Sequence, residues 1–218
     1  GAGSSLNFTT QTIATTTTET NLLASTWGDE QDLPDLVLST RTGIVLKENL
    51  GSDPSGDNLF QDHTVADYGQ TIADLTEVVV ADIDGDGDRD IVSHTGSVGE
   101  LTWYENLGTD EQGIETYQSH LIDSGETYSD LDVADIDGNG RVDLVVATPD
   151  EVRWYENRGI ATDRLIAFQS HLVSSVVNSL PVVQPADMNG DDRIDLLISD
   201  RDPSVDLFGW TLRLVENK

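Results

Sequence analysis

Apolar residues in this chain occur in short runs that are separated by turns rich in Gly, Asp and Asn. Examples are VVVA, which ends at residue 81, DIVSHT at 90–95 and DLVVAT at 143–148. These runs alternate with polar positions or are too short for a helix, and no stretch repeats its apolar residues with a period of 3.6. Short strands bounded by turn residues are therefore predicted throughout, and the fold class is all-β.

Two strand-like phrases recur along the chain with a spacing of about 50 residues. The first is FTTQTI at 8, FQDHTV at 60, YQSHLI at 117 and FQSHLV at 168, and the second is LKEN at 46, WYEN at 103 and 154 and LVEN at 214. Each cycle adds an apolar strand that ends at Ala81, Ala134 or Ala186 and another that begins at Asp90, Asp143 or Asp195. Four strands per cycle predict the blade of a β-propeller.

The phase of the repeats predicts how a ring of four four-stranded blades would close. We expect one propeller domain over residues 6–218, with repeats near 14–65, 66–122, 123–173 and 174–218, and residues 1–5 as a non-native remnant. Residues 8–13 would supply the fourth strand of the last blade and so remove an open sheet edge. The alternative is half of an eight-bladed ring or a segment of a larger propeller.

Three acidic loops follow the first strand of their cycles: DIDGDGDRD at 82–90, DIDGNGRVD at 135–143 and DMNGDDRID at 187–195. They offer oxygen ligands at positions 1, 3, 5 and 9, a backbone carbonyl near position 7 and glycine at position 4, which suits Ca²⁺. An EF-hand is excluded, because position 12 holds Ser93, Val146 or Ile198 where that loop needs a bidentate glutamate.

The predicted ligands follow from these positions. They are Asp82, Asp84, Asp86, Asp88 and Asp90; Asp135, Asp137, Asn139, Arg141 and Asp143; and Asp187, Asn189, Asp191, Arg193 and Asp195, with the residue at position 7 giving only its carbonyl. The first repeat has WGDEQDLPD here, with Trp27 at position 1, so about three structural calcium ions are expected. The first loop, which has the most carboxylates, should bind most tightly.

The net charge of the chain narrows the classes of molecule that it can bind. The formal net charge is −30, from 41 acidic and 11 basic residues. Such a surface repels nucleic acid and anionic lipid, so neither nucleic-acid binding nor membrane insertion is expected. No cysteine is present, which excludes disulfides and thiolate metal sites.

The runs DIDGDGDRDIV, DIDGNGRVDLV and DMNGDDRIDLL, each followed by WYEN or a related phrase, resemble the FG-GAP/VCBS repeats of integrin-α-like β-propellers. The resemblance covers nearly the whole chain. It implies that the loops bind calcium structurally and that the protein is an extracellular or cell-surface module for adhesion, carbohydrate binding or complex formation. The chain departs from the family in the number of its repeats, because propellers of this family usually have about seven.

Residues that recur in several repeats are expected to be structural. The histidines at 63, 120 and 171 are interpreted as strand residues that bond to neighbouring turns, and Trp103 and Trp154 as packing between blades. The repeated Glu-Asn pair is interpreted as a turn cap or a hydrogen bond at the rim. Function should lie where repeats differ. The candidates are Arg201, Phe208 and Trp210 as a weak ligand-binding rim, the loop at 51–58, Tyr68 and His94.

Two classes of function remain open. The favoured one is a calcium-stabilised module that binds glycans or extracellular proteins, as a monomer or a homodimer, with no catalytic residue. The alternative is a polysaccharide lyase or another carbohydrate-active enzyme. A lyase needs a Tyr or His base beside arginines that neutralise a uronate, and a chain of net charge −30 is poorly suited to polyanions.

Overall fold

The fold is all-β, as predicted, in the computed structural model of the chain. The structure describes residues 10–13, 20–28, 33–69, 76–95, 99–111, 113–161, 165–175, 181–201 and 210–218. Over these ranges fifteen strands form four antiparallel sheets, and no helix occurs. Among these same residues there is accordingly no helical segment that could cross a membrane.

Each sheet takes its strands in chain order, so that every strand pairs with the next one along the sequence. The bounds in the first two sheets are β1 (Thr20–Gly28), β2 (Pro34–Thr40), β3 (Gly43–Ser52), β4 (Asn58–Asp67), β5 (Thr76–Ala81), β6 (Asp90–Thr95), β7 (Glu100–Thr109) and β8 (Glu115–Ser124). In the last two they are β9 (Asp130–Ala134), β10 (Asp143–Ala147), β11 (Glu151–Ile160), β12 (Ile166–Ser175), β13 (Val182–Ala186), β14 (Asp195–Arg201) and β15 (Trp210–Val215).

The position of a strand in its sheet decides how much of it is buried. Every residue of β6 and of β10 is buried, which explains their continuous apolar runs, because neighbouring sheets cover both faces of these strands. The outer strands β8 and β12 bury no residue fully and show the same pattern of partial exposure. The repeated phrases of the sequence therefore correspond to repeated environments.

Three hydrophobic clusters lie between successive sheets. Ile44 and Leu46 of the first sheet pack with Val78 and Ile91 of the second. The second and third sheets meet through a cluster that includes Trp103 and Leu144. The third and fourth sheets meet through another cluster, which includes Val145 and Ile198. The sheets are thus joined face to face by apolar packing, as is expected of repeats that cannot bury their own faces alone.

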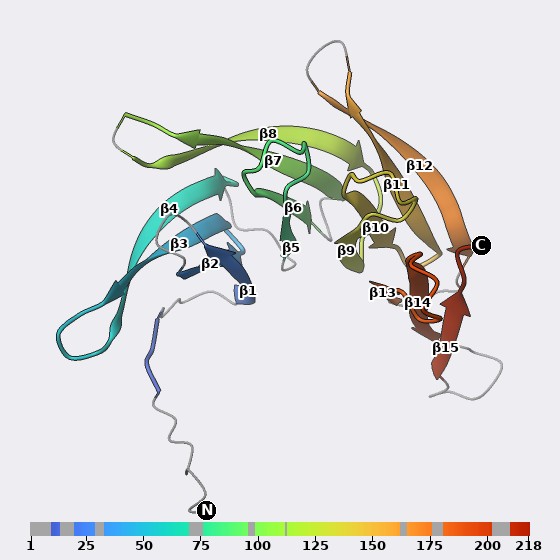
Figure 1. The fold of residues 1–218 in the computed structure, drawn as a ribbon, viewed down its shortest axis with the longest axis horizontal. Coiled ribbons are helices and arrows are strands. Elements are labelled where there is room, and N and C mark those ends of the chain that lie inside the picture. The colour runs from blue at the N-terminus through green and yellow to red at the C-terminus, as the bar shows by residue number, and fades with distance from the viewer. Residues whose placement is uncertain are drawn as a thin grey trace, which may run out of the picture.

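The four sheets are arranged along an arc (Figure 1). Strands β5, β9 and β13 lie on its inner side and β4, β8 and β12 on its outer side, and the inner strands of neighbouring sheets contact one another. The described strands leave the arc open between β1 and β15.

Closure of the ring by residues 8–13 is not confirmed. The fourth sheet has three strands among the described residues, and residues 10–13 are not in a strand. The side-chain amide of Gln11 instead bonds the backbone of Asn58 at the start of β4, donating to its carbonyl at 2.7 Å and accepting from its N–H at 2.9 Å. Phe8 and Thr9, which belong to the same expected strand, lie outside the described residues.

Candidate metal centre

The three acidic loops connect β5 to β6, β9 to β10 and β13 to β14, which are the places predicted from the sequence. In the first loop the carboxylates accept hydrogen bonds from backbone N–H groups of the same loop. Asp82 accepts from Gly85 at 2.8 Å and from Gly87 at 3.2 Å, and Asp84 accepts from Asp86 at 3.1 Å. Gly85 and Gly87 have φ angles of 81° and 101°, a conformation that favours glycine. The backbone therefore curls inward and turns the aspartates toward one point.

Asp82, Asp84 and Asp86 of the first loop bring one carboxylate oxygen each within 4.8 Å of the others, a grouping that can hold a metal ion. Asp88 is exposed, and its carboxylate lies outside this group. Asp90 is 1 % exposed, and its two oxygens accept the N–H groups of Ile83 and Asn106 at 3.0 and 2.8 Å.

The second loop gathers Asp135, Asp137 and Asp143 in the same way, with one oxygen from each within 4.8 Å of the others. Asn139 accepts a hydrogen bond from the N–H of Arg141 at 2.8 Å. The Arg141 side chain donates its Nε–H to the carbonyl of Asn157 at 2.6 Å. Arg141 can therefore offer an ion only its carbonyl, as its positive charge required.

The third loop differs from the other two. Asp187 accepts three backbone N–H groups, from Gly190, Asp191 and Asp192. Asp192 has a φ of 66° at the position where the other loops have Gly87 and Gly140. A residue with a Cβ adopts this conformation at a cost, so this loop is the more strained.

Not all of the third loop's predicted ligands are drawn together. Asp191 accepts from the N–H of Arg193 at 3.0 Å, and Asp195 accepts from Met188 and Asn217. Asn189 is exposed. Among the residues that the structure describes, no three acidic or histidine side chains of this loop form a metal-binding group.

The electrostatics of the first two loops favour a cation. Burial, followed by repulsion from Asp86, raises the pKa of Asp84. Burial also raises the pKa of Asp90 to about 6 and raises the pKa of Asp143. In the third loop the backbone N–H groups lower the pKa of Asp187 instead. A divalent ion would stabilise the charged form of the crowded carboxylates.

The last aspartate of each loop has a further structural role. Asp90, Asp143 and Asp195 each accept one N–H from inside the loop and one from the asparagine of the repeated Glu-Asn pair. For Asp143 the two donors are the N–H groups of Ile136 and Asn157, at 3.0 and 2.7 Å. Each of these aspartates therefore fixes the closing end of its loop against the third strand of its sheet.

The repeated asparagine also ties one sheet to the next. The Nδ2 of Asn157, in the third sheet, donates to the carbonyl of Ile83 in the acidic loop of the second sheet at 2.7 Å. The Nδ2 of Asn217 donates to the carbonyl of Ile136, in the acidic loop of the third sheet, at 2.8 Å. Asparagine as a turn cap is confirmed, because its Oδ1 accepts from Gly159 at 2.9 Å in the third sheet. The bond between sheets was not predicted from the sequence, because Asn157 and Ile83 are 74 residues apart.

The interpretation of the repeated histidines and glutamates needs a correction. His63, His120 and His171 bond not to turns but to Glu48, Glu105 and Glu156 of the adjacent strand, at 2.8, 2.6 and 2.8 Å. The tryptophans at 103 and 154 lie directly opposite His120 and His171 in register and stack on them, with 4.6 Å between ring centroids. Glu105 and Glu156 each lie two residues beyond the tryptophan on the same face, so they reach the histidine diagonally. The glutamates are thus partners of histidine rather than turn caps. The expected packing role of Trp103 and Trp154 is confirmed.

Of the non-repeated candidates, Trp210 is 64 % exposed. Phe208 and the side chain of Arg201 lie outside the described residues. His94 is buried and bonds Glu77 at 3.2 Å, and Glu77 also accepts the N–H of Leu131 in the third sheet, so this histidine supports the packing of two sheets. In the loop at 51–58, the carboxylate of Asp53 accepts local backbone N–H groups, as in an ordinary turn.

Comparison with known proteins supports the repeat assignment. A family model described as the FG-GAP-like repeat matches residues 82–146 and residues 135–198. The two matches overlap and together span more than half of the 218 residues, including all three acidic loops. No curated protein matches the chain.

Proposed function

Because the chain belongs to the FG-GAP-like repeat family, we propose that it is a calcium-stabilised module that binds an extracellular glycan or protein. In this proposal the acidic loops hold about three structural Ca²⁺ ions, and ligands are met on the surface that the rigid sheets present. The module acts outside the cell or at its surface, in adhesion or in complex formation.

One observation supports the calcium part most strongly. The carboxylates of Asp82, Asp84 and Asp86 converge in one loop, and those of Asp135, Asp137 and Asp143 converge in the equivalent loop of the next sheet. Calcium takes six to eight hard oxygen ligands, and these loops add backbone carbonyls to their carboxylates. The chain has no cysteine, and none of its four histidines lies in an acidic loop, so the donor set contains only oxygen.

We propose that the four sheets are blades of a propeller. The face-to-face packing of successive sheets and their arrangement along an arc support this architecture (Figure 1). The contact of Gln11 with Asn58 favours completion of the ring by further sheets, from a second copy or from a longer chain, over closure by residues 8–13. Light scattering in calcium tests this, because two copies would double the mass of 23.7 kDa.

The experiment that tests the function measures ligand binding with and without calcium. A glycan array and an array of extracellular proteins are probed with the full chain in millimolar Ca²⁺ and again in chelator. We expect a ligand that is bound in calcium and released in chelator, because the ions stabilise the loops that join the first two strands of their sheets. An Asp53→Asn variant is the matched control, since Asp53 lies in an acidic turn outside the three loops and accepts only local hydrogen bonds.

The lyase alternative is tested on the same preparation with an ultraviolet assay for unsaturated products from uronic polymers. Turnover that a single Tyr or His substitution abolishes would establish the enzyme and overturn the binding proposal. Absence of turnover together with calcium-dependent array binding would support the binding module.

A further inference from the structure

A groove of ≈ 420 Å³ lies at the boundary between the first and second sheets, where β4 approaches β7 and β8. Its lining includes Tyr68, Tyr104 and Tyr117, together with Asp67, Glu100 and Thr102. The residues that line it include two acids and no Lys, Arg or His. The groove is separate from the acidic loops and contains Tyr68, at a position where the next two repeats have Gly125 and Val176.

The second and third sheets provide an internal comparison for this boundary. Strands β7 and β11 pair with β8 and β12 in the same register and with the same irregularity, so Thr102 is equivalent to Arg153 and Glu100 to Glu151. Ala66 pairs with Ile44 in the first sheet as Asp123 pairs with Leu101 in the second, so Ala66 is equivalent to Asp123. The two boundaries therefore differ at defined positions.

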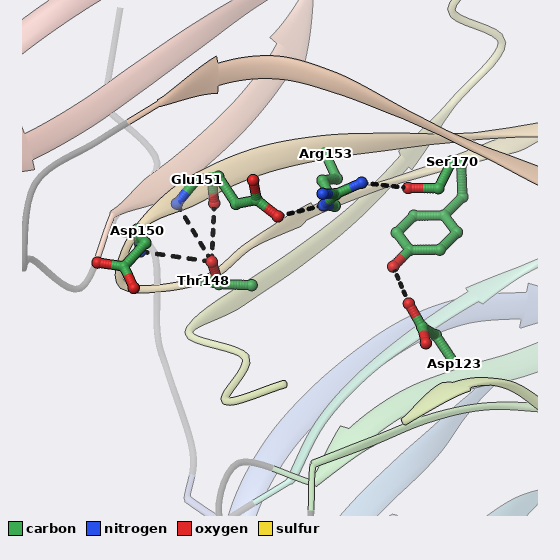
Figure 2. Close-up of polar contacts among 7 residues, drawn as sticks. Asp123, Thr148, Asp150, Glu151, Arg153 and Ser170 are labelled. Carbon is green, nitrogen blue, oxygen red and sulfur yellow. Dashed lines mark hydrogen bonds and ion pairs between the residues drawn. The ribbon is translucent and has the colours of Figure 1, made fainter. Parts of the chain in front are cut away.

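Between the second and third sheets, an arginine occupies the position that Thr102 takes in the groove. Arg153 lies between Glu151 and Ser170 in Figure 2, with its Nε–H directed to the carboxylate of Glu151 and its Nη1 donating to Ser170 at 2.9 Å. The Tyr155 hydroxyl donates to Asp123 across the boundary at 2.5 Å. Glu151 raises the pKa of Arg153. A guanidinium thus neutralises the acid, and the tyrosine is tied to an aspartate.

Between the first and second sheets the same frame lacks both partners. Thr102 is too short to reach Glu100 as Arg153 reaches Glu151, and Ala66 offers no carboxylate to Tyr104. Glu100 is exposed, and no ion pair of its carboxylate occurs among the described residues. What remains is an acid beside aromatic rings around a space, with the Tyr104 hydroxyl bonded to Ser93 and Tyr68. This is the frame of the Arg153 site without its cation.

We propose that this groove receives an arginine side chain from a partner protein. The proposal rests on the function proposed above, that the chain is a binding module, and names the partner's anchoring group. A guanidinium is planar, stacks on aromatic rings and donates in a fork to carboxylates, which suits tyrosines beside Glu100 and Asp67. The net charge of −30 steers cationic partners to the surface, whereas a neutral glycan would leave both acids unneutralised.

The test is an NMR titration of the full, isotope-labelled chain in calcium at physiological salt. The probe is N-acetylarginine N-methylamide, and the same derivative of citrulline, which has nearly the same shape without the charge, is the control. We expect saturable shifts at amides along the groove with the arginine probe and about tenfold weaker binding of the citrulline derivative.

Three variants locate the effect. Thr102→Arg places the cation of the neighbouring boundary in the groove and should abolish binding of the probe, while its melting temperature stays at or above that of the wild type. Glu100→Gln should weaken the probe about tenfold, whereas Glu151→Gln, the equivalent change at the filled boundary, should leave its affinity unchanged. The melting temperature separates a filled groove from a misfolded protein.

Equal binding of the two derivatives, shifts away from the groove, or unchanged binding by Thr102→Arg would overturn the assignment. A glycan that displaced the arginine probe from the groove would make a sugar the occupant and would also overturn it. These failures differ from failure of the proposed function. An array ligand bound equally by the wild type and Thr102→Arg in calcium would leave the binding module standing and remove only the arginine groove.

Discussion

The bond between the side chain of Asn157 and the acidic loop of the preceding sheet should contribute measurably to stability. Asn157 is fully buried, with 0 % exposure. Its Nδ2 donates to Ile83 in the second sheet at 2.7 Å and to Val142 in its own sheet at 3.0 Å, and its Oδ1 accepts from Gly159 at 2.9 Å. Replacing Asn157 by Ala removes all three bonds at once.

The size of the effect follows from the groups left without partners. Each buried polar group that loses its hydrogen bond costs about 1–3 kcal/mol, so Asn157→Ala should lower the free energy of unfolding by about 3–5 kcal/mol. Asn106 is the matched control, because it is 3 % exposed and occupies the equivalent position in the second sheet. Its side chain donates to Arg89 of its own sheet and accepts from Gly108, so that among the residues described Asn106→Ala removes only bonds within one sheet.

The assay is urea denaturation in saturating calcium, followed by tryptophan fluorescence. We expect Asn157→Ala to be about 1–2 kcal/mol less stable than Asn106→Ala, the difference being the bond to Ile83. Because Ile83 lies inside the first acidic loop, Asn157→Ala should also weaken calcium binding in that loop, although the substituted residue belongs to the third sheet. Equal unfolding midpoints for the two variants would refute the reasoning that this bond joins the sheets.

Three further results are expected. Asp82→Ala should weaken calcium binding more than Asp135→Ala in calorimetric titrations, because the first loop has five aspartates, and the reverse order would contradict this. Burial raises the pKa of Asp130 to about 6, so its protonated form stabilises the fold at low pH and this stabilisation is lost as pH rises through about 6. Asp130→Asn should therefore gain about 1–2 kcal/mol over the wild type at pH ~7.5 and nothing below pH ~4, in urea midpoints at saturating calcium; a constant difference would argue against the shift. Gly99→Ala should destabilise by more than about 2 kcal/mol, because its Cβ would lie 2.5 Å from the Glu126 carbonyl, whereas Gly113→Ala, with a similar φ and open space, should cost about 1 kcal/mol by thermal melting.

Features that repeat could be predicted from the sequence. The fully buried strand that begins at Asp90 is a continuous apolar run because sheets cover both of its faces, and its copy at Asp143 has the same burial. The loops at 82–90 and 135–143 were located by the spacing of their aspartates, which the inward-curled backbone requires. The local pattern of residues was enough to predict these strands and loops, because their structure depends on residues that are close in the sequence.

Features that join separate repeats could not be predicted in this way. The bond from Asn157 to Ile83 depends on how two sheets are placed, and no spacing in the sequence encodes that placement. The difference between Thr102 and Arg153 is visible when the repeats are aligned, but the strand register is needed to show that both positions face a boundary between sheets. Residues 8–13 share the repeated phrase, yet Gln11 stands where the other copies have histidine and it bonds Asn58 instead.

Calcium titration of the chelator-stripped chain by calorimetry, with thermal melts of the same samples, tests the central claim most directly. The account predicts saturable binding of about three Ca²⁺ ions per chain and a rise in melting temperature, with each site contributing about 2.7 kcal/mol at 100 times its dissociation constant. A chain that takes up no calcium and melts at the same temperature in calcium and in chelator would contradict it.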